Sequence, residues 1–318
     1  MTELISIVFS FRNEEDNIPV LIERVRTAVS SAGADYEMIF VDDDSSDRSG
    51  EILARAHAHD PRIKIITMSR RFGVSECVLA GMRAARGDAV IYLDADLQDP
   101  PELMPDLIAK WRDGADIVHT VRTRRLGEHP AKMWLTNQAY RLIQSTSTIN
   151  LPINAGDYKL LSRRAVDQLV QLPESDPYLR GLVSWIGFTQ ATVSYERQAR
   201  HAGITHFPLF SRNPWKTAIN GFISFSFTPV YAILISGMAG TGLGLLLVLL
   251  GLIGLVFGGS GGLALGGLAL AAWGSIMAAI GLTGLYVIRT YKDARGRPLY
   301  VVRSTLGLDN QSRDGSPA

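Results

Sequence analysis

The chain has 318 residues, a formal net charge of +1 at pH 7 and 20% charged residues, a smaller charged fraction than soluble enzymes usually carry. Its single cysteine excludes an internal disulfide bond, and a net charge this close to zero gives no reason to expect nucleic acid as a partner. The missing charge has one location: from Thr217 to Ile288 there is no Asp, Glu, Lys, Arg or His.

Residues 1–120 alternate short apolar runs with amphipathic stretches. We predict strands at Ile5–Ser10, Glu37–Val41, Ile63–Met68 and Ala89–Leu93, helices near 17–31, 48–58 and 75–85, and further helices over 131–146 and 162–171. This alternation is typical of an α/β fold in which crossover helices connect a mostly parallel sheet. Ligands of such sheets bind beyond the carboxyl ends of the strands, so we expect the chemistry in the loops that follow them.

Each predicted strand is followed by a polar cluster, and the fourth cluster contains Asp94 and Asp96. In an extended segment residues i and i+2 face the same side, so both carboxylates can point at one cation. Oxygen ligands suit Mg²⁺ or Mn²⁺, which would bridge a substrate diphosphate, and Gln98 could add another oxygen. The alternative is structural, because Asp99 and the prolines after it could simply begin the helix predicted near Glu102.

Three consecutive aspartates, Asp42 to Asp44, follow the second predicted strand. A carboxylate there can accept hydrogen bonds from a nucleobase N–H or a ribose hydroxyl, which predicts a nucleotide contact. The same charges suit the N-terminus of the next helix, which Asp47 or Ser49 would cap, and the two roles are compatible. A dinucleotide site is not expected, because no G-x-G-x-x-G sequence follows the first strand.

Asp157 follows a turn at Asn154-Ala-Gly156, and we predict that it starts a helical stretch. It is a candidate general base or sugar-positioning carboxylate, and alternatively a helix cap. Arg122, Lys132 and Arg200 are candidates for binding the phosphate of an acceptor. Basic residues near a bilayer also contact anionic lipid without any catalytic role, so this alternative stays open for each of them.

The uncharged segment is long enough for two membrane-spanning helices, since each span needs roughly 20 apolar residues. We place the spans at about 231–257 and 263–288, with Gly258 to Gly262 as the break between them. Basic residues flank both spans on the outside, so the positive-inside rule predicts that the catalytic domain and both termini are cytoplasmic. The aromatic and basic segment 211–230 is expected at the membrane interface, and 289–318 is a cytosolic tail that we expect to be disordered from Asp309 onward.

Taken in order, these clusters resemble one family, the inverting GT-A glycosyltransferases that make polyprenyl-phosphate sugars. The chain is similar to dolichol-phosphate mannose synthases and closest in layout to bacterial bactoprenol glucosyltransferases. The resemblance covers nearly the whole chain and rests on Ser6–Glu15, Val41–Asp47, Ser69–Gly73, Leu93–Pro101, Gly156–Arg164, Arg180–Phe188 and Arg295–Tyr300. Three segments depart from the family pattern, namely Ser10–Glu14, Arg71–Val74 and Gly203–Phe207, and the last has His206 in place of the family's lysine.

The resemblance implies a Rossmann-like GT-A catalytic domain over 1–210 and assigns roles to residues within it. The nucleotide sugar would be lined by Phe11, Glu14, Asp42, Asp43 and Asp94. A divalent metal would be held by Asp94, Asp96 and Gln98, and Asp157 together with Asp96 would be catalytic.

We therefore expect an enzyme of the cell membrane that transfers a sugar to polyprenyl phosphate with inversion, using UDP-glucose in preference to GDP-mannose. A processive polysaccharide synthase is less favoured, because the chain lacks a Gln-x-x-Arg-Trp motif and further spans. A non-catalytic, membrane-anchored nucleotide-binding subunit would not need the paired carboxylates. Small-residue faces formed by Gly251, Gly254 and Gly258 also predict a homo-oligomer that associates through its spans.

Overall fold

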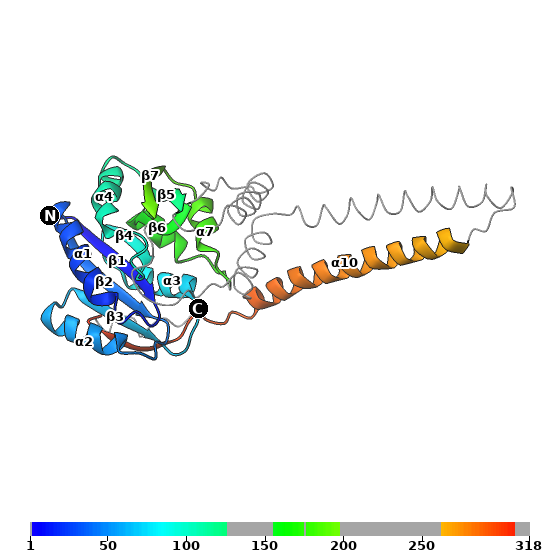
Figure 1. Cartoon of the computed structure of the whole chain (residues 1–318), viewed down its shortest axis with the longest axis horizontal. Coiled ribbons are helices and arrows are strands. Elements are labelled where there is room, and N and C mark those ends of the chain that lie inside the picture. Colours follow the sequence, from blue (N-terminus) through cyan, green and yellow to red (C-terminus); the bar gives the residue numbers. More distant parts are fainter. Residues whose placement is uncertain (1, 126–154, 175, 198–261, 309–318) are drawn as a thin grey trace.

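The computed structural model describes residues 2–125, 155–174, 176–197 and 262–308. These residues form an eight-stranded sheet in the order β7-β5-β6-β4-β1-β2-β3-β8, with helices on both faces (Figure 1). Its strands are β1 (Leu4–Phe11), β2 (Asp35–Asp42), β3 (Ile63–Met68), β4 (Ala89–Asp94), β5 (Ile117–Arg125), β6 (Ala155–Ser162), β7 (Gln190–Arg197) and β8 (Val302–Leu306). The first four strands pair in parallel, as predicted, whereas β6 and β8 run antiparallel to their neighbours.

The elements of the N-terminal half agree closely with the prediction. Each of the first four strands begins and ends within two residues of its predicted position, because parallel strands covered on both faces are continuous apolar runs. The helices between them are α1 (Ile18–Ser31), α2 (Ser49–His59) and α3 (Val74–Ala84). The helix predicted over 162–171 corresponds to α6 (Arg163–Leu169), and the one predicted over 131–146 lies outside the described residues.

The two faces of the sheet bury separate apolar cores. Phe9 and Phe40 stack at 4.6 Å between ring centroids on the face covered by α1, α2 and α4 (Met104–Arg112), which follows the short helix η1 (Pro101–Leu103). The opposite face packs against α3, α6 and α7 (Leu179–Trp185). Gly81 allows α3 to lie directly on β1, because a Cβ at this position would be 2.3 Å from Cγ1 of Val8.

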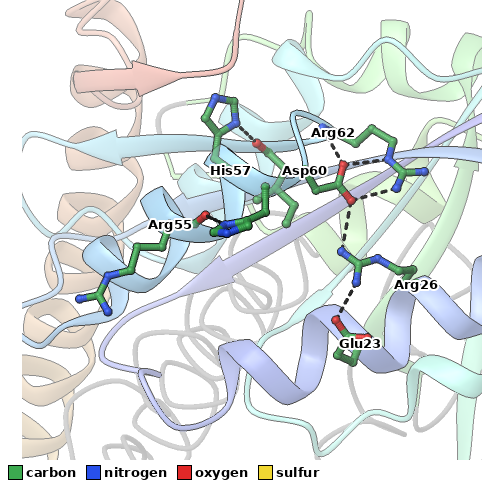
Figure 2. Close-up of polar contacts among 8 residues, drawn as sticks. Glu23, Arg26, Arg55, His57, Asp60 and Arg62 are labelled. Carbon is green, nitrogen blue, oxygen red and sulfur yellow. Dashed lines mark hydrogen bonds and ion pairs between the residues drawn. The ribbon is translucent and has the colours of Figure 1, made fainter.

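Ion pairs join α1 to the connection between α2 and β3 (Figure 2). Asp60, at the end of α2, accepts two hydrogen bonds from Arg62 at 2.9 Å and one from Arg26 at 3.2 Å, and Arg26 also contacts Glu23 at 2.6 Å. The hydrogen bonds from Arg62 lower the pKa of Asp60 to about 2, against the opposing effect of burial. This cluster lies at the amino end of β3, whereas the active site is predicted at the carboxyl ends of the strands, so we assign the cluster to stability.

Helix α10 (Gly262–Ala294) contains the second predicted span, 263–288, and extends away from the sheet (Figure 1). Within the described ranges, no helix combines the length and the apolar character that crossing a membrane requires. The first predicted span, 231–257, and the predicted interfacial segment 211–230 lie outside those ranges, as does the end of the tail from Asp309. The membrane hairpin therefore stays a prediction.

The base of α10 is joined to the catalytic domain. Arg289 bonds to Glu174 at 2.9 Å and Lys292 to Asp176 at 2.5 Å, both in the segment that leads into α7. The chain after α10 then returns to the sheet, where β8 pairs with the edge of β3. Strand β8 was not predicted from the sequence.

Candidate active site

The loops that follow β1, β2 and β4 contain strained backbone at the carboxyl edge of the sheet. Asn13, Asp44 and Leu97 each follow one of these strands, with φ angles of 56°, 61° and 58°. A positive φ is uncommon for residues other than glycine, and most unusual for a bulky one such as leucine. Strained residues of this kind cluster at functional sites, where the surrounding structure holds them in place. Their location supports the predicted edge as the candidate site.

Hydrogen bonds lock the loop after β1 to the loop after β2. The backbone N–H of Asn13 donates to Ser45 Oγ at 3.0 Å, and that of Glu14 donates to Ser49 Oγ at 3.0 Å. Asp47 accepts from the Ser49 N–H at 3.1 Å, but the N-cap of α2 is Arg48 and has no side-chain capping bond, so the predicted cap at Asp47 or Ser49 was wrong. Ser49 itself makes no capping bond, because its hydroxyl faces the neighbouring loop.

The predicted nucleotide residues Phe11 and Glu14 are both buried at this edge. Phe11 packs edge to face against Phe40 at 6.3 Å, within the core beneath α1. The carboxylate of Glu14 accepts a hydrogen bond from the side-chain amide of Asn17 at 2.5 Å. Both side chains support the loop after β1, and their contact with a nucleotide stays a prediction.

Asp42 and Asp43 are also buried, and each carboxylate organises a loop. Asp42 accepts from the Ser45 N–H at 2.8 Å, and burial raises its pKa despite this hydrogen bond. Asp43 reaches across to the loop after β3, where it accepts from the N–H of Phe72 at 2.7 Å and of Gly73 at 3.4 Å. The two aspartates therefore organise the loops after β2 and β3, and their contact with a nucleotide stays a prediction.

Asp94 is the last residue of β4 and contacts β1 through a hydrogen bond from Ser10 Oγ at 3.2 Å. Burial and the nearby carboxylates of Asp157, Asp96 and Asp99 raise its pKa to about 7. The geometric reason given for pairing Asp94 with Asp96 was wrong, because the strand ends at Asp94 and Asp96 lies in a turn. The Asp96 carboxylate accepts from the Gln98 N–H at 3.1 Å, and its charge contributes to the raised pKa of Asp94.

Asp99 does not cap a helix, which was the structural alternative for this segment. It is 2% exposed and accepts a hydrogen bond from the hydroxyl of Tyr195 in β7. Helix η1 begins after Pro100 without a side-chain cap. Asp99 therefore connects the loop that carries Asp96 and Gln98 to β7, an edge strand of the sheet.

Asp157 lies within β6, so the prediction that it starts a helical stretch was wrong. The segment is a strand because its residues alternate between the two faces: Tyr158 and Leu160 enter one core and Leu161 enters the other. Tyr92 of β4 pairs with Lys159 of β6 in the antiparallel register. Two residues further along that register, Asp157 comes opposite Asp94 at the carboxyl edge, where its charge contributes to the raised pKa of Asp94.

Arg180, in the first turn of α7, makes the principal contact with Asp157. Its Nε and Nη2 donate to the two carboxylate oxygens at 2.6 and 2.5 Å, which is the bidentate geometry that makes Arg–carboxylate pairs strong. The resemblance included Arg180 in a motif without giving it a role. Nothing in the local sequence pairs it with Asp157, because the contact depends on how α7 packs over β6.

A second row of polar side chains lies one step deeper on the same sheet face. Lys159 is 1% exposed, donates to the Gly156 carbonyl at 2.8 Å and has its Nζ 5.8 Å from the centroid of the Tyr92 ring. Burial and the charge of Lys159 lower the pKa of His119 to about 4, so this histidine is neutral. The hydroxyl of Tyr92 is buried and has no hydrogen-bond partner among the described residues. Lys159, His119 and Tyr92 therefore place polar groups in the buried layer next to Asp94 and Asp157.

The residues present are compatible with a divalent metal that the substrate helps to hold. Within the described ranges, no group of three or more His, Cys, Asp or Glu side chains is arranged to hold a metal ion. Mg²⁺, however, is usually bound through one or two carboxylates together with substrate phosphates. Burial first, and then the nearby carboxylates, raise the pKa of Asp94, and a cation would relieve the repulsion between those carboxylates. Asp94 and Asp96 therefore fit a shared site of this kind.

The predicted acceptor-phosphate residues are placed only in part. Arg122 belongs to β5, where its backbone pairs with Tyr195 of β7. Lys132 and Arg200 lie outside the described residues, and so their role stays a prediction.

Comparison with known proteins identifies relatives over nearly the full length of the chain. The chain is 38% identical to the uncharacterized glycosyltransferase YkcC of Bacillus subtilis, over 96% of this chain and 95% of the relative. It is 34% identical to the bactoprenol glucosyl transferase of Shigella phage SfII, over 95% and 98% of the two chains. A solved glucosyl-3-phosphoglycerate synthase from Mycobacterium tuberculosis has a TM-score of 0.49 and 20% identity, over 70% of this chain and 79% of that chain.

A family model described as glycosyl transferase family 2 matches residues 6–170. The match covers β1 to β4 and the loops that hold the aspartates described above, and it continues through β6 with Asp157. Together with the full-length relatives, it shows that this chain is a glycosyltransferase and belongs to glycosyl transferase family 2.

Proposed function

We propose that the enzyme transfers glucose from UDP-glucose to a polyprenyl phosphate, with inversion, at the cytoplasmic face of the cell membrane. The observation that carries the proposal is the identity of 33–34% with proteins named bactoprenol glucosyl transferase, which extends over at least 94% of this chain. The candidate-site residues from Phe11 to Asp157 also lie within the family 2 match over residues 6–170.

In the proposed reaction, an oxygen of the lipid phosphate forms a bond to the anomeric carbon as the bond from that carbon to the nucleoside diphosphate breaks. The electron pair of the broken bond leaves with the nucleoside diphosphate, on the side opposite the attack, which inverts the centre. Asp94 and Asp96 would hold Mg²⁺ or Mn²⁺, whose bound charge neutralises the diphosphate. Because the lipid phosphate is already anionic, Asp157 is not required to remove a proton.

We assign Asp157 to positioning at the reacting sugar, with Arg180 holding its carboxylate in one orientation. A fixed carboxylate near an anomeric carbon stabilises positive charge that develops there as the leaving group departs. The bidentate contact with Arg180 restricts the rotation of Asp157, so the charge is in place before the substrates bind.

The proposed location at a membrane is supported by the sequence and by the surface of α10. No charged residue or histidine occurs from Thr217 to Ile288, and the positive residues Arg289 and Lys292 follow at once. On α10, Trp273, Ile276 and Ile280 are each more than half exposed. A surface of this kind is favourable in lipid and unfavourable in water. We propose that the uncharged segment from Thr217 to Ile288 anchors the enzyme at the membrane.

The test is transfer from radiolabelled sugar nucleotides to undecaprenyl phosphate by the purified full-length enzyme in the presence of Mg²⁺. We expect product from UDP-glucose, and its loss in Asp96→Ala and Asp157→Asn. A preference for GDP-mannose would correct the donor, and a lack of product from any donor would refute the proposed acceptor. Wild-type rates in both variants would refute the roles of the two carboxylates.

A further inference from the structure

Arg303, which lies in the tail after α10, reaches the loops of the candidate donor site. Its Nη2 donates to Asp44 Oδ1 at 2.8 Å and to the carbonyl oxygen of Ser69 at 2.8 Å. Asp44 is at the end of the loop segment that begins with Asp42 and Asp43, and Ser69 is the first residue after β3. A single nitrogen from the tail thus bridges the loop after β3 and the loop after β2, beside the predicted nucleotide residues Asp42 and Asp43.

A β-bulge in β8 sets the direction of the Arg303 side chain. In the pairing of β8 with β3, Ser304 lies opposite Thr67 and Val302 lies opposite Met68, which leaves Arg303 as the extra residue. Bulges disturb the alternation of a strand and redirect one side chain, and they occur frequently beside active sites. A hydrogen bond from the Ser69 N–H to the Val301 carbonyl, at 2.9 Å, keeps the tail against the end of β3 beyond the bulge.

The loops after β2 and β3 are consequently joined twice. Asp43 joins them from within the catalytic domain through Phe72 and Gly73, and Arg303 joins them from the tail. The contact with Arg303 also falls on strained backbone, since Asp44 has a φ of 61°. An arginine that neutralises Asp44 in this conformation favours one spacing of the two loops.

We propose that Arg303 is a positioning residue for the sugar nucleotide: the strand after α10 completes the donor site by holding the loops of Asp44 and Ser69 at the spacing that the nucleoside requires. The inference rests on the proposed function for the location of the donor, and adds that the tail takes part in donor binding. Because α10 leads directly into this tail, the donor site is also connected to the proposed membrane anchor.

Kinetics of the full-length enzyme test the proposal, with the donor that the wild type uses, UDP-glucose by our assignment. The pair is partly exposed, and its loss together with one hydrogen bond predicts a rise in donor KM of about three- to tenfold in Arg303→Ala. We expect kcat and the KM for undecaprenyl phosphate to stay at their wild-type values. Arg303→Lys should restore most of the donor affinity, because one nitrogen makes both bonds and a lysine Nζ can replace it, whereas Arg303→Met should not.

Arg297→Ala is the matched control, since Arg297 is an exposed arginine of the same tail that precedes the bulge. It should leave the donor KM unchanged. Wild-type donor KM in Arg303→Ala would overturn the inference. So would a general loss, in which kcat falls, both KM values rise, the melting temperature drops and lysine gives no rescue, because that result assigns Arg303 to folding alone.

Calorimetric titration of UDP in the presence of Mg²⁺ separates this inference from the proposed function. Weaker UDP binding in Arg303→Ala would support the inference even if no glucose reached the lipid. Normal transfer to the lipid with unchanged UDP binding in the variant would leave the function intact and overturn the inference. A wild type that binds neither UDP nor GDP would overturn both.

Discussion

Replacing Arg180 with alanine removes the cation that holds Asp157 beside Asp94. In the structure Arg180 contacts both oxygens of Asp157, and Asp157 in turn acts on the pKa of Asp94. Without the arginine, the Asp157 carboxylate can rotate, and its negative charge near Asp94 is no longer balanced by the Arg180 cation. We expect a lower kcat, because the carboxylate is no longer fixed at the reacting sugar.

The magnitude follows from the burial of the pair. The side chains of Arg180 and Asp157 are 28% and 30% exposed, so the pair is neither fully buried nor on the open surface. Exposed pairs contribute about 0–1 kcal/mol, whereas removing one partner of a buried pair costs about 3–5 kcal/mol. An intermediate loss of about 1–3 kcal/mol corresponds to a fall in kcat of about five- to 150-fold. Arg180→Lys should recover only part of it, because lysine cannot form the bidentate contact.

The assay is the initial rate of glucose transfer at saturating concentrations of both substrates. Arg164→Ala provides a matched control, because Arg164 makes a similar two-point contact with Asp116 at the amino end of β5. This control should lower the melting temperature and leave kcat within about twofold of the wild type. The double variant Arg180→Ala with Asp157→Asn should be less impaired than the product of the single effects, because both changes break the same contact.

Two results would refute this reasoning. If Arg180→Ala has the kcat of the wild type, the pair has no part in the reaction. If Arg180→Ala and Arg164→Ala reduce kcat equally and in proportion to their loss of stability, the effect of Arg180 is on folding.

Three further predictions concern stability and reactivity. Asp60→Asn should lower the free energy of unfolding by about 1–2 kcal/mol at pH 7, measured by thermal unfolding. The pKa of Asp60 is about 2 in the folded state and near 3.9 in the unfolded state, so the difference from wild type should persist above pH 4 and shrink as the pH falls toward 2. A difference that does not change with pH would contradict this prediction. Gly81→Ala should cost about 1–3 kcal/mol through its clash with Val8, be partly rescued by Val8→Ala, and contrast with Gly50→Ala, where a Cβ meets nothing within 4 Å. Cys77 is buried and its pKa is raised by burial, so iodoacetamide at pH 8 should label it only after denaturation; rapid labelling of the native enzyme would contradict its place on the buried side of α3.

The sequence predicted those residues of the candidate site that lie at the carboxyl ends of the predicted strands. Asp42, Asp43 and Asp94 come at the ends of apolar runs, and parallel strands bring their carboxyl ends to one edge, so local pattern and topology together were sufficient. Asp157 was misplaced because a run containing Lys159 does not resemble a buried strand. Lysine is almost never fully buried, and its contacts with Gly156 and Tyr92 help to hold it here.

The sequence by itself determined β1 to β4, the helices between them and the strands' polar ends, because apolar periodicity is a property of neighbouring residues. It also determined the uncharged segment on which the proposed anchor depends. Only the tertiary structure decided that Arg180 pairs with Asp157 and that Arg303 pairs with Asp44, partners that are 23 and 259 residues apart in the chain. Contacts of that kind depend on strand register, a bulge and the packing of α7, none of which is encoded in any short stretch of sequence.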